Sequence, residues 1–241
     1  MNEQFAQWLT GFLEGDGTIH CVKHAQYKNP KWVSTQVKVD FSQKDPSVLN
    51  YIYNTLECGN FTYGQGTTRL AYQNKTRCIP LLEAFVRYVA TEHTRQQLSK
   101  ALKVLGIDVE PTIHTPTIDW VSGFWDAEGG SSLGVNSELY LKIYQKNKDI
   151  LDTIRQFVKI GYILEYPNRN GELMHSWVVS GQEAHDFAQL ILPRLHCDRK
   201  KQELTERTNT YTNHLKTLNW MKNNPNHPMI TKVVDRMRTE G

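Results

Sequence analysis

The sequence lacks the features that would place it in several common protein classes. No stretch of about 18 apolar residues occurs, which excludes a membrane-spanning helix. The first residues include Glu3 and Glu14 and no basic run, so they are not typical of a secretory signal. The four cysteines are scattered without a C-x-x-C pair, and the nine histidines show no metal-ligand spacing. We therefore expect an intracellular protein with reduced thiols and no zinc site, whether or not it is organelle-encoded.

The chain also has little net charge, at +3 over 241 residues, but that charge is unevenly distributed. Between Thr18 and Lys44, five lysines stand against a single acid, Asp40. Residues 62–77 contain three basic residues and no acid. Segregated positive charge favours a polyanionic partner, although ordinary solvated lysines explain the same pattern equally well.

The sequence repeats itself once. The segment WLTGFLEGDG at residues 8–17 returns as WVSGFWDAEG at residues 120–129, an offset of 112 residues. In both halves an alternating segment ending in Gln-Lys follows, and then an apolar helical pattern closed by Gly59 or Gly161, which we expect to cap the helix. The predicted units are residues 1–106 and 119–218, joined by a linker at 107–118 and followed by a tail at 219–241 without assigned role.

Each half is predicted to contain one helix, two strands, a second helix, a second hairpin and one or two further helices. Val37, Val39 and Phe41 alternate with polar residues, as do Leu139 and Leu141, which is the pattern of a half-buried strand. The fold class is therefore α+β, with the order αββαββα repeated twice.

The repeated motif has its own physical logic. Gly11 and Gly15 lie four residues apart, like Gly123 and Ala127, so each pair marks a helix face on which two backbones can approach closely. Both motifs then end in two acids, although acids are disfavoured at the negative end of a helix dipole. Two such ends brought together form an anionic pocket on a pseudo-twofold axis, and hard divalent cations are its natural occupants.

Both motifs resemble the LAGLIDADG signature, at residues 9–17 and 121–129, and the layout over residues 5–215 is similar to single-chain LAGLIDADG homing endonucleases. This resemblance implies a pseudo-twofold monomer in which two motif helices pack at the centre and two curved antiparallel sheets form a saddle for DNA. The implied activity is site-specific cleavage of both strands of double-stranded DNA with a divalent cation, Mg²⁺, for which Mn²⁺ would substitute. No membrane association is implied.

The resemblance also implies residue roles. The last acid of each motif, Asp16 and Glu128, would bind the metal together with the backbone carbonyls of Gly15 and Ala127. Glu128 departs from the usual Asp, and its longer side chain predicts unequal rates on the two strands. The preceding acids are expected to be structural, acting as caps or as partners of the other helix.

Further catalytic residues are expected around this pocket. Gln43 and Gln145 end matching strands and would orient water, although a glutamine at a strand end is ordinary in itself. A basic residue late in each half would offset phosphate charge or lower the pKa of the attacking water. The candidates are Arg95 in the first half and Lys200 in the second, with Arg199 and Lys201 as alternatives to Lys200.

DNA contacts are expected on the strand faces opposite the core, because polar side chains there suit groove readout and lysines suit phosphates. The two faces differ, which predicts a long, non-palindromic target. The expected contacts are Thr18, His20, His24, Gln36, Lys38, Asp40, Arg69, Gln73, Lys75, Ser132, Asn136, Tyr140, Lys142, Arg169 and His175.

Two other functions fit the same scaffold. Some members of this family are maturases that bind intron RNA, and a regulator could bind DNA without cleaving it. Intact motif acids argue against a purely non-catalytic role, while intron RNA remains an alternative partner.

Overall fold

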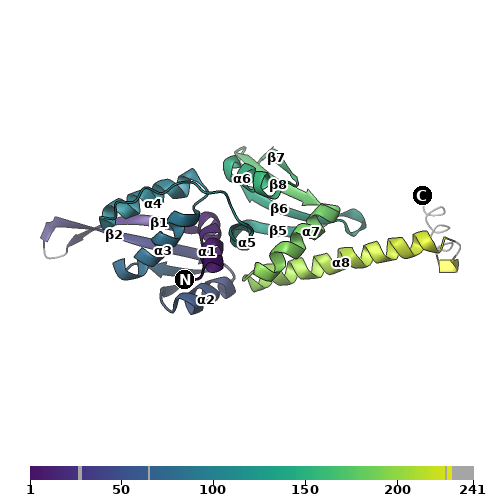
Figure 1. The fold of residues 1–241 in the computed structure, drawn as a ribbon, viewed down its shortest axis with the longest axis horizontal. Helices are drawn as coiled ribbons and strands as arrows, with labels where there is room; N and C mark the ends of the chain where they lie inside the picture. Colours follow the sequence, from purple (N-terminus) through teal and green to yellow (C-terminus); the bar gives the residue numbers. More distant parts are fainter. Residues whose placement is uncertain (27–28, 65, 226, 230–241) are drawn as a thin grey trace.

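The computed structural model describes residues 1–26, 29–64, 66–225 and 227–229, and it consists of two halves with the same order of elements (Figure 1). The first half contains α1 (Glu3–Asp16), β1 (Gly17–Gln26), β2 (Asn29–Gln43), α2 (Pro46–Leu56), β3 (Asn60–Gly64), β4 (Thr67–Tyr72), α3 (Lys75–Tyr88) and α4 (Glu92–Leu105). The second half contains α5 (Ile118–Glu128), β5 (Gly129–Leu133), the 3₁₀ turn η1 (Val135–Ser137), β6 (Leu139–Gln145), α6 (Lys148–Val158), β7 (Tyr162–Pro167), β8 (Leu173–Ser180), α7 (Gly181–Ile191), the 3₁₀ turn η2 (Leu192–Arg194) and α8 (Asp198–Asn223).

Each half builds one four-stranded antiparallel sheet. The strand orders, β1-β2-β4-β3 and β5-β6-β8-β7, are equivalent in the two halves. The register is equivalent too: Val39 of β2 lies opposite Ile19 and Tyr72, and Leu141 of β6 lies opposite Ser131 and Val179. The predicted α+β class, with its element order repeated twice, is confirmed.

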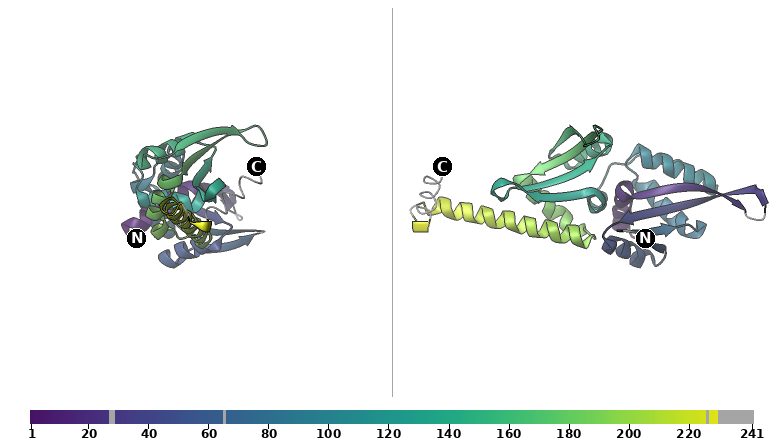
Figure 2. Two further views of the ribbon diagram at one scale, coloured as in Figure 1. Left: turned by 90° about the vertical axis from the view of Figure 1, so that its right-hand side faces the viewer. Right: turned by 180° about the vertical axis from the view of Figure 1, so that it is seen from behind.

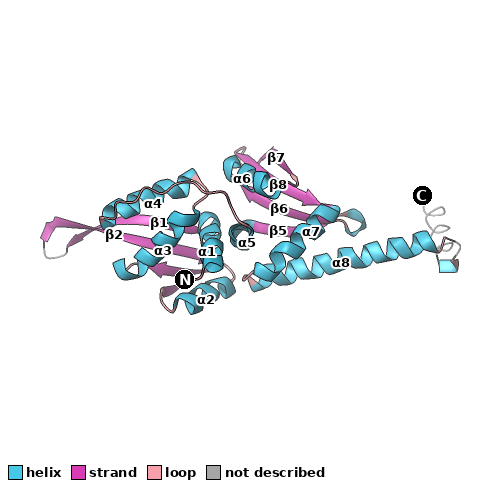
Figure 3. Cartoon of the chain, viewed as in Figure 1, coloured by secondary structure: helices cyan, strands magenta, loops and turns pink. Residues whose placement is uncertain are grey.

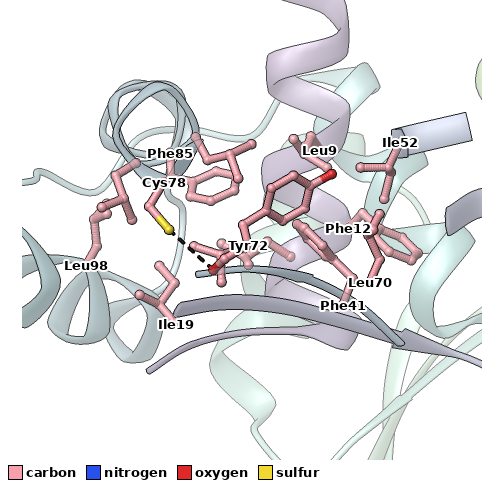
Figure 4. Close-up of a cluster of buried hydrophobic side chains, with 14 of the residues drawn as sticks. Leu9, Phe12, Ile19, Phe41, Ile52, Leu70, Tyr72, Cys78, Phe85 and Leu98 are labelled. Carbon is pink, nitrogen blue, oxygen red and sulfur yellow. Dashed lines mark hydrogen bonds between the residues drawn. The ribbon is translucent and has the colours of Figure 1, made fainter. Parts of the chain in front are cut away.

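Helices cover one face of each sheet and leave the other face to the solvent (Figures 2 and 3). Val39, Phe41, Leu141 and Ile143 are fully buried, as their alternation predicts. Each half has its own hydrophobic core, and that of the first half includes the thiol of Cys78, which donates to the carbonyl oxygen of Tyr72 at 3.3 Å (Figure 4). All four cysteines are free thiols.

Local sequence determines where α2 and α6 begin and end. Asp45 and Asn147 cap the two N-termini by accepting backbone N–H bonds. The predicted glycine caps are wrong by two residues: the helices close on Glu57 and Lys159, which adopt the left-handed conformation, and the glycines follow in the turn.

The last helix runs past residue 218, the predicted end of the second unit, into the predicted tail. α8 runs to Asn223 and extends beyond the second sheet (Figure 1), because no proline or glycine interrupts it before Pro225. No helix in the described part of the chain has the length and apolarity needed to cross a bilayer. Residues 106–117, between α4 and α5, contain neither helix nor strand.

Candidate active site

The two motif helices, α1 and α5, pack against each other backbone to backbone between the two sheets (Figure 1). A Cβ atom placed on Gly11 would lie 1.9 Å from the carbonyl oxygen of Trp120, and one on Gly123 would lie 1.9 Å from that of Trp8. A Cβ on Gly15 would meet Cβ of Ala127 at 2.3 Å. The small residues are therefore required by this contact, as the motif spacing predicts.

This packing brings the two last motif acids together. A Cβ on Gly15 would lie only 3.2 Å from Cγ of Glu128, so the Glu128 side chain lies beside the C-terminal end of α1. Burial, followed by the charge of Glu128, raises the pKa of Asp16 to about 7. Burial also raises the pKa of Glu128. The structure thus contains the expected anionic pocket, formed by one carboxylate from each half.

The two predicted glutamines reach this pocket from the ends of β2 and β6. The Gln43 side-chain amide donates to the Asp16 carboxylate and, at 3.4 Å, to the carbonyl oxygen of Ala127. Gln145 hydrogen-bonds to Glu128, which opposes the rise in that carboxyl's pKa. Each glutamine therefore contacts the acid of its own half.

Lys200 is the cation that α8 brings to the acids. Its Nζ donates to the carbonyl oxygens of Ala127 at 2.6 Å and Trp125 at 3.2 Å, and the side chain is buried. Burial lowers the pKa of Lys200, while nearby Cys197, Asp16, Asp126 and Glu128 oppose this effect. The alternatives lie outside the pocket, since Arg199 and Lys201 are exposed.

Arg95 does not lie at the pocket, contrary to prediction. Its guanidinium pairs with Glu92 at 2.7 Å and Glu110 at 2.8 Å. Thr91 and Cys197 are the equivalent N-caps of α4 and α8, so Lys200 corresponds to Thr94, and Arg95 corresponds to Lys201. One residue along a helix rotates a side chain by about 100°, which turns Arg95 away.

The penultimate acid of each motif accepts hydrogen bonds from partly or fully buried groups, and Asp126 in this way connects the two halves. Asp126 accepts hydrogen bonds from Nε1 of Trp8 at 3.0 Å and from the backbone N–H groups of His196 and Cys197. Glu14 accepts the backbone N–H of Ala90 at 2.7 Å, and burial raises its pKa to about 7. This agrees with the structural role expected for them. The tryptophan donor was missed, although a Trp stands at the same place in both motifs.

The open sheet faces carry many, but not all, of the predicted DNA contacts. His20, Lys38 and Arg69 surround Asp40 on the first sheet, where Lys38 Nζ lies 3.3 Å from the Asp40 carboxylate. Asp40 is thus buried beneath basic side chains and does not itself present a surface for DNA. Thr18, Gln36, Ser132, Asn136, Tyr140, Lys142 and Arg169 are at least partly accessible.

Three of the remaining predicted contacts need correction. His175 shares the core-side parity of Trp177, is buried and lies 3.0 Å from the carbonyl oxygen of Lys146. Gln73 and Lys75 lie in the loop after β4 and in the first turn of α3, and so not on a strand face. The side chain of His24 lies outside the described residues.

The pocket fits a divalent cation bound mainly by oxygen. Burial raises the proton affinity of both carboxylates, and the charge of Glu128 raises that of Asp16 further. A cation would relieve this repulsion, and Mg²⁺ commonly uses one or two carboxylates plus water. Within the described residues, no group of three His, Cys, Asp or Glu side chains has ligand geometry. The Ala127 carbonyl is already bonded to Lys200 and Gln43, so its role as a ligand stays a prediction.

Comparison with known proteins assigns the motif region to a family. The family model described as LAGLIDADG endonuclease matches residues 9–101. Residues 9–101 thus resemble a LAGLIDADG endonuclease domain. This match begins at Leu9, the first residue of the first LAGLIDADG-like motif, and covers most of the first half; the second half repeats the same fold. The resemblance seen in the sequence is confirmed.

Solved LAGLIDADG homing endonucleases share the fold over nearly the whole chain. I-AabMI bound to uncleaved DNA has a TM-score of 0.66 and 16% identity, covering 90% of this chain and 92% of its own. I-GzeII in complex with a DNA target has a TM-score of 0.63 and 13% identity, covering 96% of both chains. I-SmaMI bound to uncleaved DNA in the presence of calcium ions has a TM-score of 0.62 and 12% identity, covering 99% and 98%.

Two curated relatives are named as intron-encoded proteins. The intron-encoded RNA maturase bI4 of Saccharomyces cerevisiae is 27% identical over 195 residues, which is 77% of this chain. The probable intron-encoded endonuclease aI2 of Debaryomyces hansenii is 27% identical over 143 residues, or 58% of this chain. The matched regions span only 29% and 20% of these longer relatives.

Proposed function

We propose that this protein is a site-specific endonuclease that cleaves both strands of duplex DNA with Mg²⁺, for which Mn²⁺ substitutes. The observation that carries the proposal is the convergence of Asp16 and Glu128 at the ends of two helices packed through their backbones. Two carboxylates held close together in an apolar setting repel each other, and a bound cation would neutralise that repulsion.

The acids, the glutamines and the lysine of the pocket would each have a different role in hydrolysis. A divalent cation held by Asp16 and Glu128 would stabilise charge on the phosphate and activate a water. Gln43 and Gln145 fix the orientation of these carboxylates and offer amide groups to water at the rim. The buried ammonium of Lys200 offsets the charge that develops on the phosphate.

DNA would lie along the open sheet faces. Lys38 and Arg69 on the first sheet and Lys142 on the second supply positive charge for phosphates. Because corresponding positions in the two sheets carry different residues, a single chain would read two different half-sites, and the target would be long and non-palindromic. The protein would act as a monomer, since both halves of the pocket belong to one chain.

RNA binding is a second candidate function. It is favoured by the similarity to a relative named as an intron-encoded RNA maturase, which extends over 77% of this chain. The motif acids remain in place, so RNA binding would accompany DNA cleavage and would not replace it.

The test of cleavage uses a plasmid library with random inserts. The purified chain is incubated with the library and Mg²⁺, and all new DNA ends are sequenced. We expect recurrent ends within one long asymmetric site, absent with Glu128→Gln and absent when Ca²⁺ replaces Mg²⁺. Retention of one site without new ends would indicate a binding protein, and neither cutting nor binding would refute the proposal.

A further inference from the structure

The open face of the second sheet is aromatic. Cross-strand register places Tyr140 and Tyr144 of β6 on this face, together with Tyr162 and Tyr166 of β7. Trp177, one residue before Val178 on β8, points into the core, so the tyrosines belong to the opposite, solvent-facing side. The four tyrosines are therefore not part of the hydrophobic core.

Two of these tyrosines contact each other, and two are largely exposed to the solvent. Tyr144 and Tyr166 contact each other edge to face, with ring centroids 6.5 Å apart. Tyr144 and Tyr162 expose 45% and 48% of their surface. Val178 of β8, the strand that lies between β6 and β7, is only 2% exposed. The tyrosines thus present ring surface to the outside.

The fold does not require these tyrosines, as the first sheet shows. Gln43 and Gln145 are equivalent strand ends, so the positions of Tyr140 and Tyr144 correspond to Lys38 and Ser42. By the same register, Tyr162 corresponds to Asn60 and Tyr166 to Gly64. Two halves with the same backbone thus present one charged, polar face and one aromatic face.

Charge on this face suits a polyanion. Lys142 lies in the middle of it, with Nζ 5.5 Å from the centroid of the Tyr140 ring. The outward positions of β5 to β8, all within the described residues, include no carboxylate; Glu138, just before β6, accepts a hydrogen bond from the Tyr140 hydroxyl at 2.8 Å. A lysine amid exposed rings is the combination by which proteins hold the backbone of a single strand while its bases stack on aromatic side chains.

Unpaired bases fit this face better than duplex bases do. A base in a duplex is stacked on both sides and offers only its edge to a groove, so exposed rings gain little from it. A base in an RNA loop, bulge or end is free to stack on tyrosine. Serine hydroxyls at Ser132 and Ser180 on the same face could bond the 2′-hydroxyl that marks RNA.

We propose that the open face of the second sheet binds unpaired RNA nucleotides through Tyr140, Tyr144, Tyr162 and Tyr166. The inference rests on the RNA-binding candidate function and assigns it a surface. Because DNA is proposed to occupy the same face, RNA and duplex DNA would compete for it.

The test is fluorescence anisotropy of the full chain with a labelled 20-nucleotide, mixed-sequence, single-stranded RNA. The key variant, Tyr144→Ser with Tyr162→Asn, introduces the residues found at the corresponding positions of the first sheet. Loss of two stacking partners, at ~1–3 kcal/mol each, is expected to weaken RNA binding about 30-fold or more. Tyr63→Asn is the matched control, because Tyr63 is 74% exposed on β3 of the first half; it is expected to leave RNA binding unchanged.

A second variant separates stacking from folding and from hydrogen bonding. Tyr144→Phe with Tyr162→Phe keeps both rings, so wild-type RNA affinity and melting temperature are expected. The proposal is overturned if the Ser/Asn variant binds RNA like wild type, if the Tyr63 control weakens binding equally, or if single-stranded DNA binds as tightly as RNA. Absence of any RNA binding by wild type would instead remove the RNA-binding function itself, while DNA cleavage in Mg²⁺ is measured separately.

Discussion

The active site contains one buried lysine where its pseudo-symmetry provides two positions, and this predicts unequal cleavage of the two DNA strands. Lys200 and Thr94 occupy equivalent places in α8 and α4. A cation about 6 Å from a phosphate, at an effective dielectric of ~20, contributes ~3 kcal/mol. That energy corresponds to a rate difference of about 100-fold between the two strands.

The assay labels the two strands of the target with different dyes and follows both cuts under single-turnover conditions. Thr94→Lys supplies the missing cation, so it is expected to accelerate the slow strand and bring the ratio of the two rates toward one. Lys200→Thr makes the second half resemble the first and is expected to slow the fast strand. Arg95→Met is the control, because Arg95 pairs with Glu92 and Glu110 away from the pocket.

Two results would refute this reasoning. The first is equal cutting of both strands by the wild-type protein. The second is a strand ratio that stays the same in Thr94→Lys and in Lys200→Thr while both proteins keep the wild-type melting temperature. In either case Lys200 would have a structural role in holding the carbonyls at the end of α5.

Three further predictions concern stability and are measured by urea unfolding. Gly11→Ala is expected to lower the free energy of unfolding by about 3 kcal/mol, because its Cβ would overlap the Trp120 carbonyl. Gly130→Ala is the control and should change this free energy little, because its Cβ would lie 4.0 Å from the Lys142 carbonyl oxygen. Equal effects of the two substitutions would contradict the proposed helix packing. Trp8→Phe is expected to cost ~1–3 kcal/mol because Asp126 loses a buried donor. Trp120→Phe should cost less, because the Trp120 indole N–H lies near Glu14 without a hydrogen bond of good geometry. His196 stacks on Tyr51 at 3.6 Å, and burial followed by the charge of Lys201 lowers its pKa to about 4. Stability should therefore fall by ~1 kcal/mol, after allowance for solvent screening, as pH drops from about 6.5 to 4, and His196→Phe should abolish that loss.

The sequence predicts the larger features of this molecule because they depend on local pattern. Two copies of one motif predict the repeated order of elements, and alternation identifies Val39 and Leu141 as core residues. The glycine spacing predicts the helix contact, since only small residues permit it. The four pocket residues come together because each ends a helix or strand that is directed at the pseudo-twofold axis. They are Asp16, Glu128, Gln43 and Gln145.

The failures arise where a side chain's direction depends on tertiary placement. Arg95 and Thr94 are neighbours in sequence, and only the cap positions of α4 and α8 show which corresponds to Lys200. Asp40 has the parity of an exposed residue, but Lys38 on its own strand and Arg69 on the neighbouring strand β4 cover it. The register of β8 against β6, which turns His175 toward the core side, likewise depends on pairing between distant segments.

The most direct test of the shared centre uses the duplex target with each strand labelled and compares wild type with Asp16→Asn and Glu128→Gln. Binding is first measured in Ca²⁺, and Mg²⁺ is then added. We expect both variants to bind the target like wild type and to lose at least ~100-fold in cleavage on both strands, because one centre uses both acids. Wild-type cleavage of both strands by either variant would contradict a metal centre formed by Asp16 and Glu128.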